Sequence, residues 1–530
     1  MRCLPVLVLL LLPATLSAAT FTVTNLNDSG AGSLRQAITD AQAATGTDVI
    51  QFQTGLSGTI STASALPGIF TSLIIQGNNE VAISGAGSGS RIFSVASTGS
   101  SIDISLRNLT MADGSAIGGA GIAVAANAGD VDFELVECTV RNCIADIGAG
   151  LFLTASSGMT ITATLERCTF TQNSGAVVGS ATYVENAVFL TATNCTFSGN
   201  GISSQCSMLH FAQTASCVLV HCTVTDNNCG ASSALQQTSG SVSIGNCIVA
   251  GNTTTGASPD GAGAFTSLGG NVIGDATGMA ITAQTGDQIG TTAAPIDPLL
   301  SPLAANGGAT LTHRIDNASP AVDAGDWSLA PSDDQRGYTR VDQPDCGAVE
   351  LQSPQIDVAL GGSLTDGQVF FLVGAGTPGT GRDEVFTITN FAAAGEKNLT
   401  LQPTLPIAFG GFGNCTAAVT SPPQGTIAPL TATNFTLTIT PTAQGLYWCE
   451  VVVLSDDPIT PTFNVTLVGA ADAPSSSGGG GGGGDGDDGS CSTGTGAASW
   501  LLLLGALATL SLAIRLLRRR GAKACTTAQA

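Results

Sequence analysis

Basic residues are scarce in this sequence. Its 530 residues include 16 lysines and arginines against 38 aspartates and glutamates, which gives a formal charge of −22 at pH 7. Binding to a nucleic-acid backbone requires a basic surface, so we expect no nucleic-acid partner. We interpret the acidic excess as a solvated surface that keeps the protein soluble.

Lysine and tryptophan are missing from the region between Asp48 and Asp287, whose arginines are Arg91, Arg107, Arg141 and Arg167. A polysaccharide lyase needs a strong base beside the abstracted proton, usually lysine or arginine. Tryptophan offers the largest aromatic surface on which a sugar could stack. Both absences argue against an enzyme that degrades polysaccharides.

What the sequence does contain is an internal repeat marked by cysteine. Successive members of the repeat lie 24 to 30 residues apart, and asparagine extends the register at both ends: Asn108, Cys138, Cys168, Cys195, Cys222, Cys247 and Asn271. A period of this size predicts a solenoid in which each repeat is one supersecondary unit stacked on its neighbours.

Each repeat contains a short strand, for example Arg167-Cys168-Thr169-Phe170. Because side chains alternate along a strand, we expect the cysteine and the Val or Phe two residues later to be buried, and the threonine and the residue before the cysteine to face water. Another apolar residue three positions before each cysteine requires a corner between the two. Asparagine five residues after most of the cysteines predicts a second corner in the left-handed conformation. The pattern predicts a right-handed parallel β-helix.

The cysteine column could bind metal or could pack inside the solenoid. Zinc sites use ligands close in sequence, often in pairs, whereas each rung of a solenoid supplies one cysteine. Free cysteine is among the most frequently buried residues. We therefore predict a packing column with no metal and no cofactor. The other cysteines of the region could pair with one another, in a connectivity that the sequence leaves open: Cys143, Cys206, Cys217 and Cys229.

Both ends of the chain carry patterns related to membranes. Residues 1–19 have Arg2, an apolar run and a small-residue cleavage site, which is typical of a signal peptide. The uncharged run 497–514 predicts a single transmembrane helix, and the arginines after it predict a cytoplasmic tail at 515–530. A flexible Gly- and Asp-rich linker at 472–496 precedes the run. We expect a protein of the cell envelope, anchored in the membrane, whose bulk lies outside the cytoplasm.

Cys491 lies in this linker, directly before the apolar run. The order of glycine-rich spacer, cysteine, apolar helix and arginine cluster resembles the C-terminal sorting signals of bacterial surface proteins. In those signals a dedicated protease removes the helix and the basic tail, so the resemblance implies processing near Cys491. A plain single-span anchor shares most of the pattern and is the alternative.

A short amphipathic helix is predicted after the signal peptide. Ser33 and Gln36 form a capping box, and one apolar stripe follows, made of Leu34, Ala37, Ile38 and Ala41. Such a helix would cover the first coil of the solenoid, where strand edges are otherwise unpaired. The segment resembles the CSLREA-type cap of bacterial β-helix surface proteins, although Gly32 and Gln36 replace its Cys and Glu.

Two resemblances concern the solenoid and its end. Phe170–Asn173 and Phe197–Asn200 resemble the Phe-x-x-Asn half of the repeat in polymorphic outer membrane proteins, which are exposed adhesins. Residues 293–353 resemble the choice-of-anchor Q domain, through motifs such as Ser319-Pro320-Ala321-Val322-Asp323 and Asp334-Gln335-Arg336-Gly337. In bacteria that domain follows a β-helix and precedes a surface anchor. The resemblance implies that it closes the capped solenoid of residues 20–292.

Residues 354–471 change to alternating strands separated by turns, which predicts an antiparallel β-sandwich of immunoglobulin type. The stretch from Leu454 to Leu467 resembles the choice-of-anchor D and related immunoglobulin-like domains. Cys415 and Cys449 are the predicted disulfide, because they lie 34 residues apart outside the membrane. Closing such a loop contributes about 3 to 4 kcal/mol.

Catalysis must be weighed because many parallel β-helices are polysaccharide lyases or glycosidases, although a fold does not determine function. A glycosidase needs two carboxylates that face each other across a cleft. The spacing of Asp113, Asp146 and Asp226 sets up no such pair. The three histidines, His210, His221 and His313, are isolated, and we expect His221 to face solvent.

We therefore predict a non-catalytic bacterial cell-surface protein, an adhesin or structural element that displays its β-helix to an extracellular glycan or to the surface of a host or neighbouring cell. The alternative is an envelope-associated polysaccharide lyase or glycoside hydrolase of the β-helix type. An opposed carboxylate pair or an acidic groove on one flank of the solenoid would favour the enzyme. A smooth flank rich in Thr and Ser would favour the adhesin.

Overall fold

The computed structural model describes residues 18–201, 207, 209–392, 395–403, 406–457 and 460–472. These residues all belong to the first of two compact units, Met1–Ala473. Most of the predicted signal peptide, Cys206, Cys491 and the apolar run 497–514 lie outside the described ranges. Within those ranges no helix is long and apolar enough to cross a membrane.

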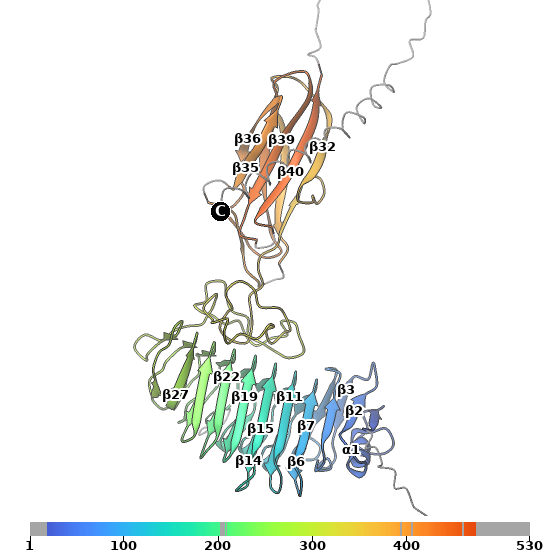
Figure 1. Ribbon diagram of the computed structural model, residues 1–530, viewed down its shortest axis with the longest axis vertical. Coiled ribbons are helices and arrows are strands. Elements are labelled where there is room, and N and C mark those ends of the chain that lie inside the picture. The colour runs from blue at the N-terminus through green and yellow to red at the C-terminus, as the bar shows by residue number, and fades with distance from the viewer. Residues whose placement is uncertain are drawn as a thin grey trace, which may run out of the picture. The chain divides into compact units, whose positions relative to one another are not determined.

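A parallel β-solenoid forms the first part of the described chain, which confirms the predicted repeat (Figure 1). Sheet A has one strand from nearly every coil: β1 (Thr20–Val23), β2 (Asp48–Phe52), β4 (Leu73–Gln76), β7 (Ile102–Arg107), β11 (Val131–Val136), β15 (Ile161–Glu166), β19 (Val188–Thr193), β22 (Ser216–Val220), β25 (Ser241–Gly245) and β27 (Gly261–Gly269). Sheet B follows the first corner: β3 (Gly58–Ser61), β5 (Val81–Ser84), β8 (Thr110–Ala112), β12 (Thr139–Arg141), β16 (Thr169–Thr171), β20 (Thr196–Ser198), β23 (Thr223–Thr225), β26 (Ile248–Val249), β28 (Val272–Ile273) and β30 (Gln288–Ile289).

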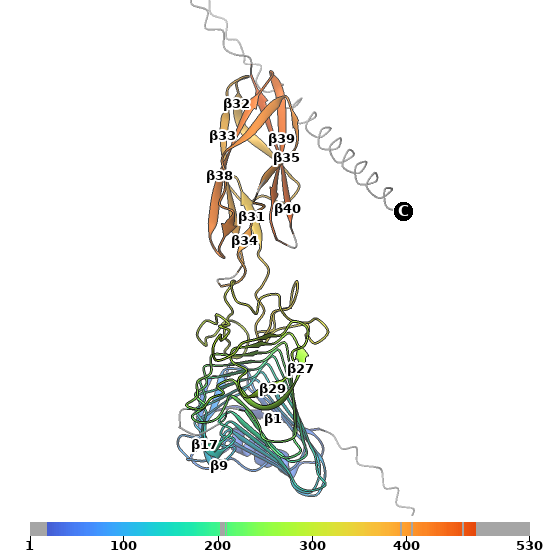
Figure 2. The ribbon, with the colours of Figure 1, turned by 90° about the vertical axis from the view of Figure 1, so that its left-hand side faces the viewer.

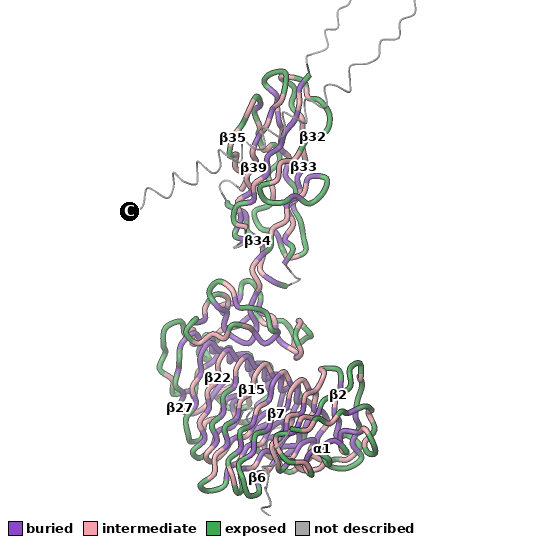
Figure 3. The backbone as a smooth tube through the Cα atoms, turned by 45° about the vertical axis from the view of Figure 1, so that its right-hand side comes forward, coloured by how far each residue is buried: buried purple, intermediate pink, exposed green. Residues whose placement is uncertain are grey.

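Two further sheets complete the coils. Sheet C contains β6 (Phe93–Ser97), β10 (Ile122–Ala126), β14 (Leu151–Ala155), β18 (Thr182–Glu185), β21 (Leu209–Phe211) and β24 (Leu235–Gln237), and β27 joins it to β29 (Met279–Ile281). Sheet D contains β9 (Ser115–Gly118), β13 (Ile144–Ile147) and β17 (Ser174–Val178). Figure 2 shows the coils stacked behind one another, and Figure 3 shows buried residues running along their strands.

The first corner lies between the apolar residue and the cysteine, as the parity of the sequence requires, and the structure places it directly before the cysteine position. The residue before the cysteine has a left-handed backbone in every coil from β7 to β26, with φ between 50° and 55°: Asn108, Glu137, Arg167, Asn194, His221 and Asn246. The pairing of Thr139 with Thr110 therefore places Leu109 in the cysteine column. The prediction that Asn108 belongs to that column is wrong, because Asn108 is a corner residue. Asn271 does belong to it, since Ile248 pairs with Val272.

The cysteines of the column are fully buried: Cys138, Cys168, Cys195, Cys222 and Cys247. Each thiol donates to the carbonyl oxygen two residues earlier, as in the 3.3 Å contact from Cys195 Sγ to Thr193 O. Burial raises the pKa of Cys195 well above its usual value, as does its thiol neighbour Cys168. Phe170 and Phe197 stack beside the column with ring centroids 5.2 Å apart.

A ladder of buried asparagines lines the second corner: Asn173, Asn200, Asn227 and Asn252. The side-chain amides of the first three donate to the next side-chain carbonyl, as from Asn200 Nδ2 to Asn227 Oδ1 at 3.1 Å, and Asn252 Nδ2 donates to Asp260 Oδ1 at 2.8 Å. The side-chain carbonyl oxygens of the last three also accept the backbone N–H of the preceding ladder residue, as in the 3.0 Å bond from Asn200 N to Asn227 Oδ1, and Asn173 Oδ1 accepts the backbone N–H of Cys143. The expectation that these residues adopt the left-handed conformation is wrong, because that backbone lies one residue earlier, at Gln172 and Asp226.

The predicted cap helix is present as α1 (Leu34–Ala43), whose apolar stripe is buried against the first coil. Ser33 accepts the backbone N–H of Gln36, as a capping residue should. The reciprocal half of the capping box is missing, because the Gln36 side chain donates to Asp40 instead.

Residues 297–351, here called the strap, cross the outer face of sheet B. Gln335 Nε2 donates to Thr169 Oγ1 at 2.9 Å, and Thr196 Oγ1 donates to Gln335 Oε1 at 2.6 Å. Ala348 N donates to Thr223 Oγ1 at 3.0 Å. The threonines of sheet B were expected to face water, and this is wrong because the strap covers them.

The same cover explains His221, which was expected at the surface and is fully buried. Its Nε2 accepts from Asn246 Nδ2 at 2.8 Å, so Nδ1 carries the proton and donates to Gly347 O at 3.3 Å. Burial, and the nearby Arg340, lower the pKa of His221 well below its usual value. The neutral imidazole is therefore part of the strap interface.

Two four-stranded sheets follow the strap and share one apolar core, as far as the described residues extend. One contains β31 (Ile356–Ala359), β33 (Arg382–Asn390), β38 (Ala432–Pro441) and β36 (Cys415–Ser421). The other contains β32 (Gln368–Gly376), β40 (Thr462–Ala471), β39 (Gly445–Leu454) and β35 (Ile407–Gly413), and β34 (Leu399–Thr400) pairs with β37 (Thr426–Ile427). Cys415 and Cys449 lie on different sheets. Their thiols are not joined by a disulfide and hydrogen-bond to each other. The disulfide stays a prediction.

Candidate functional site

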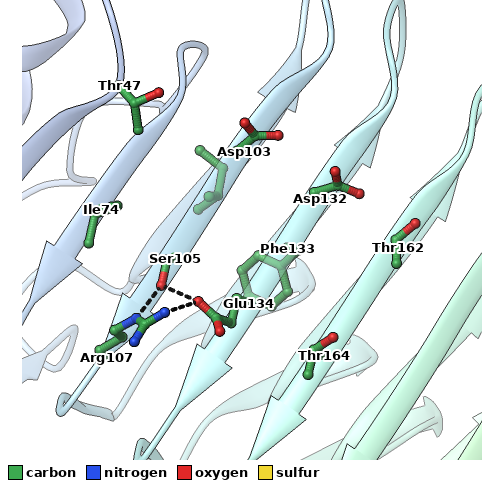
Figure 4. A pocket seen from close by; sticks show the side chains of 11 residues that line it. Thr47, Ile74, Asp103, Ser105, Arg107, Asp132, Phe133, Glu134, Thr162 and Thr164 are labelled. Atoms are coloured by element: carbon green, nitrogen blue, oxygen red, sulfur yellow. Dashed lines mark hydrogen bonds and ion pairs between the residues drawn. The ribbon is translucent and has the colours of Figure 1, made fainter. Parts of the chain in front are cut away.

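A pocket of about 570 Å³ opens on the outer face of sheet A, over β4, β7, β11 and β15 (Figure 4). We call it the sheet A pocket. Its polar lining comes from outward positions of these strands, where side chains alternate with core residues such as Ile104 and Phe133. The lining side chains of this pocket are Asp103, Ser105, Arg107, Asp132, Glu134, Thr162 and Thr164, with Thr47 and Ile74 at the edge.

Two aspartates lie side by side at one end of the pocket. The strand register pairs Asp103 with Asp132 and Asp132 with Thr162. Both aspartates are exposed, and within the described residues neither carboxylate has a cationic partner. Adjacent strands are about 4.8 Å apart, so two like charges lie on neighbouring rungs. Like charges in this position destabilise a sheet, which makes the pair costly for the fold.

The opposite end of the pocket holds a closed polar cluster. Ser105 Oγ donates to Glu134 Oε2 at 2.7 Å, and Arg107 Nε donates to Ser105 Oγ at 2.7 Å. The Arg107 guanidinium also forms a 2.5 Å ion pair with Glu134 (Figure 4). An arginine held in this way by a carboxylate is a positively charged donor, which does not suit it to abstract a proton.

Hydroxyl groups dominate the same face in the later coils. The column of Ser105 and Glu134 continues through Thr164 and Thr191, and then through Val218, Ser243 and Thr266. The column of Asp103 and Asp132 continues through Thr162 to Phe189, and then to Ser216 and Ser241. The flank is therefore acidic at the pocket and rich in Ser and Thr beyond it.

The structure does not bring together the carboxylates that were named from the sequence. Asp113 and Asp226 are left-handed corner residues, with φ of 59° and 55°. Asp113 accepts from Ser84 Oγ at 2.7 Å, which gives it a role in its turn. Asp146 is exposed on sheet D, away from both. None of the three lines the sheet A pocket.

The other two histidines, His313 and His210, are both held by contacts with neighbouring residues. His313 lies in the strap, where its Nδ1 donates to Ser301 O at 2.6 Å and its Nε2 accepts from Ser198 Oγ at 2.8 Å. Burial lowers the pKa of His313. His210 stacks on Tyr183 with ring centroids 5.2 Å apart. These contacts fix the strap and sheet C, and no histidine lines the sheet A pocket.

The strap contains the densest group of buried charges in the described residues. Arg340 pairs with Glu350 at 2.9 Å, and Arg336 pairs with Asp334 at 2.8 Å, with all four side chains fully buried. Burial, with Glu350 nearby, raises the pKa of Asp345 to about 7. Asp345 accepts the backbone N–H groups of Asp323 and Leu351. We interpret the group as the polar core that holds the strap together, since it has no access to solvent.

The acidic residues of the pocket differ from Asp113, Asp146 and Asp226, which were weighed from the sequence, because they lie at outward positions within the strands of sheet A. Two signals were present. Asp103, Ser105 and Arg107 alternate with Ile104 and Leu106, as on the open face of a strand. Asp132 and Glu134 repeat that pattern 29 residues later, which is one turn of the solenoid.

No family model and no curated protein matches this chain. Among solved structures it is similar to a protein of unknown function from Porphyromonas gingivalis W83, with 13% identity over 23% of this chain and 48% of the other, at a TM-score of 0.17. The secreted serine protease VesC from Vibrio cholerae matches at 19% identity over 19% of this chain and 21% of the other, with a TM-score of 0.16. The PapD-like domain 7 of human CEP192 matches at 14% identity over 23% and 88%, also at 0.16. The chain spans about half of the first protein and about a fifth of the second.

Proposed function

We propose that this chain is a non-catalytic bacterial surface protein that displays its β-helix and binds a glycan or protein ligand through the sheet A pocket. The observation that carries this proposal is the pocket itself, where two carboxylates without cationic partners lie beside a satisfied Arg107–Glu134 pair. These two carboxylates destabilise the sheet, and their presence has a physical reason if they accept hydrogen bonds from hydroxyl or amine groups of a ligand. The Ser- and Thr-rich face beyond the pocket extends the same hydrogen-bonding surface.

The proposal includes the finer architecture expected from the sequence. The solenoid is right-handed, the two sheets after it form an immunoglobulin-like sandwich, and residues 293–353 act as the choice-of-anchor Q domain. A signal peptide exports the chain, and the segment around Cys491 and residues 497–514 holds it at the cell envelope. The support comes from the sequence patterns at both ends.

A polysaccharide-cleaving enzyme is the second candidate, and one observation favours it. Asp103 and Asp132 lie in register on neighbouring strands about 4.8 Å apart, and this spacing is close to the roughly 5 Å between the two carboxyl groups of retaining glycosidases. Against it, both aspartates are exposed and lie next to each other on one open face. A glycosidase places its carboxylates on opposite sides of the scissile bond.

The experiment uses the purified full-length protein with a panel of acidic and neutral polysaccharides. We expect binding without release of reducing ends or unsaturated sugars, and at least a tenfold weaker binding for the Asp103→Asn/Asp132→Asn double variant. Glu80→Gln removes an exposed carboxylate that does not line the pocket and serves as the matched control. Release of either product by the wild type, with loss in the double variant, would establish the enzyme. Unchanged binding in the double variant would overturn the role of the pocket.

A further inference from the structure

Sheet D carries a group of exposed apolar side chains on three successive rungs. Ile117 on β9 is 79% exposed, Ile144 on β13 is 61% exposed and Val177 on β17 is 55% exposed. These strands lie on one flank of the solenoid (Figure 2). Clusters of exposed apolar residues with a polar rim mark interaction sites, whereas single exposed residues need no explanation.

A carboxylate lies in the middle of this group. The register pairs Ala145 with Ala116 and Ile147 with Gly118, so Asp146 lies opposite Ile117. On the other side, Ala145 pairs with Gly175 and Ile147 with Val178, which places Asp146 opposite Ala176 and Val177. Asp146 is exposed, and no hydrogen bond or ion pair to its carboxylate occurs among the described residues. The order along the solenoid axis is therefore apolar, acidic, apolar.

The third rung reaches this arrangement through a β-bulge. Two residues of β17, Ala176 and Val177, face the single residue Asp146, and both are exposed. A bulge turns a side chain away from the position that regular pairing would give it, and bulges gather near functional sites. Here the bulge coincides with the exposure of both Ala176 and Val177.

We propose that this group, Ile117, Asp146 and Val177 with Ile144 beside them, binds a basic amphipathic helix of a partner protein. The spacing supports a helix that lies along the solenoid axis. Three rungs span about 9.6 Å. Residues i, i+4 and i+7 of a helix lie on one face and span about 10.5 Å. A helix with apolar residues at i and i+7 and lysine or arginine at i+4 would thus match the three rungs.

The negative charge of the chain favours a basic partner helix over a second copy of the chain. The net charge of −22 makes two copies repel each other, and it also repels an anionic membrane surface. A cationic residue between two apolar ones complements Asp146 and the two side chains beside it. Three exposed side chains form a small contact, so the binding should be weak and reversible.

The test titrates the full-length protein with an alanine-rich helical peptide that carries leucine, lysine and leucine at i, i+4 and i+7, and with a second peptide that has glutamate in place of the lysine. We expect the lysine peptide to bind about five times more tightly, the modest ratio typical of an exposed ion pair. In Asp146→Asn this ratio should fall to about one. In Ile117→Ser both peptides should lose binding, while Glu80→Gln, which removes an exposed carboxylate outside both proposed sites, should leave the binding of both peptides unchanged.

Ile117 is so exposed that Ile117→Ser should fold normally, and an unchanged circular dichroism spectrum and melting temperature would establish this. Equal binding of the two peptides by the wild type would overturn the proposal. So would absence of binding by both, or binding that Ile117→Ser leaves unchanged. A sedimentation experiment that shows dimers lost in Ile117→Ser would assign the surface to a second copy instead, and would also overturn the proposal.

Discussion

Replacing Asn200 by alanine should destabilise the solenoid more than any exposed substitution. Asn200 is 1% exposed, and its Oδ1 accepts the backbone N–H of Asn173 at 3.1 Å and the side-chain amide of Asn173 at 3.0 Å. In Asn200→Ala both donors lose this acceptor inside the solenoid. An unsatisfied buried donor costs about 1 to 3 kcal/mol, so the free energy of unfolding should fall by about 2 to 6 kcal/mol.

Other hydrogen bonds of the ladder remain in Asn200→Ala, and they limit how far the free energy of unfolding should fall. Asn227 Oδ1 still accepts the backbone N–H of residue 200 at 3.0 Å, and Asn173 Nδ2 still donates to Val140 O at 2.9 Å. Neighbouring repeats stabilise one another across each interface, so a defect in a central coil weakens both halves.

The measurement is urea denaturation of the purified protein followed by circular dichroism, with midpoints compared at equal slope. The matched control is Asn127→Ala, because Asn127 is exposed and no hydrogen bond of its side chain is recorded among the described residues. This control should change the free energy of unfolding by less than about 0.5 kcal/mol. A loss below about 1 kcal/mol in Asn200→Ala would refute the view that the ladder is a structural spine.

Two further substitutions test the buried columns. Cys195→Ser should lower the free energy of unfolding by about 1 to 3 kcal/mol because it buries a hydroxyl in place of a thiol, and Cys195→Ala should cost less; stoichiometric metal that is lost with Cys195 would contradict this. Asp260 accepts from Asn252 Nδ2 at the end of the ladder, and burial raises its pKa to about 6 from 3.8. Because the folded state holds this proton more tightly, the contribution of Asp260 to stability is present below about pH 4 and is lost as pH rises through 6, by about 3 kcal/mol. Urea midpoints at several pH values should therefore fall less steeply from pH 4 to 7 in Asp260→Asn than in the wild type, and parallel curves would contradict the assignment.

The inward columns of the solenoid could be predicted from the sequence because they are local and repeated. The cysteine and the apolar residue three positions before it have incompatible parity, which places a corner between them, and the structure locates that corner at Glu137 and Arg167. The ladder asparagines were recognised but explained wrongly. Periodic asparagine fits either a left-handed corner or an amide ladder, and only the neighbouring coil decides between them, as Asn200 and Asn227 show.

The outward face of sheet B could not be predicted because a distant segment covers it. Thr169 reads as solvent-facing within its own strand, yet Gln335 and Leu311 lie on it, more than 140 residues further along the chain. Alternation along a strand states which residues share a face, but it does not state what covers that face. The burial of His221 has the same cause, since its partner Gly347 also belongs to the strap.

Departures from the repeat are therefore the best guide to function in this chain. Inward positions repeat because every coil must pack on the next, so a substitution at an inward position lowers the stability of the solenoid. Outward positions of sheet A carry no such constraint, and in the later coils most of them hold Ser or Thr, as in β15 and β25. Two pairs of residues depart from this pattern. Asp103 and Asp132 on sheet A place like charges side by side, which destabilises the sheet, and Ile117 beside Asp146 on sheet D exposes an apolar side chain, which lowers solubility. Neither pair stabilises the coil beneath it, and this is the physical reason to look for ligands at these two places first.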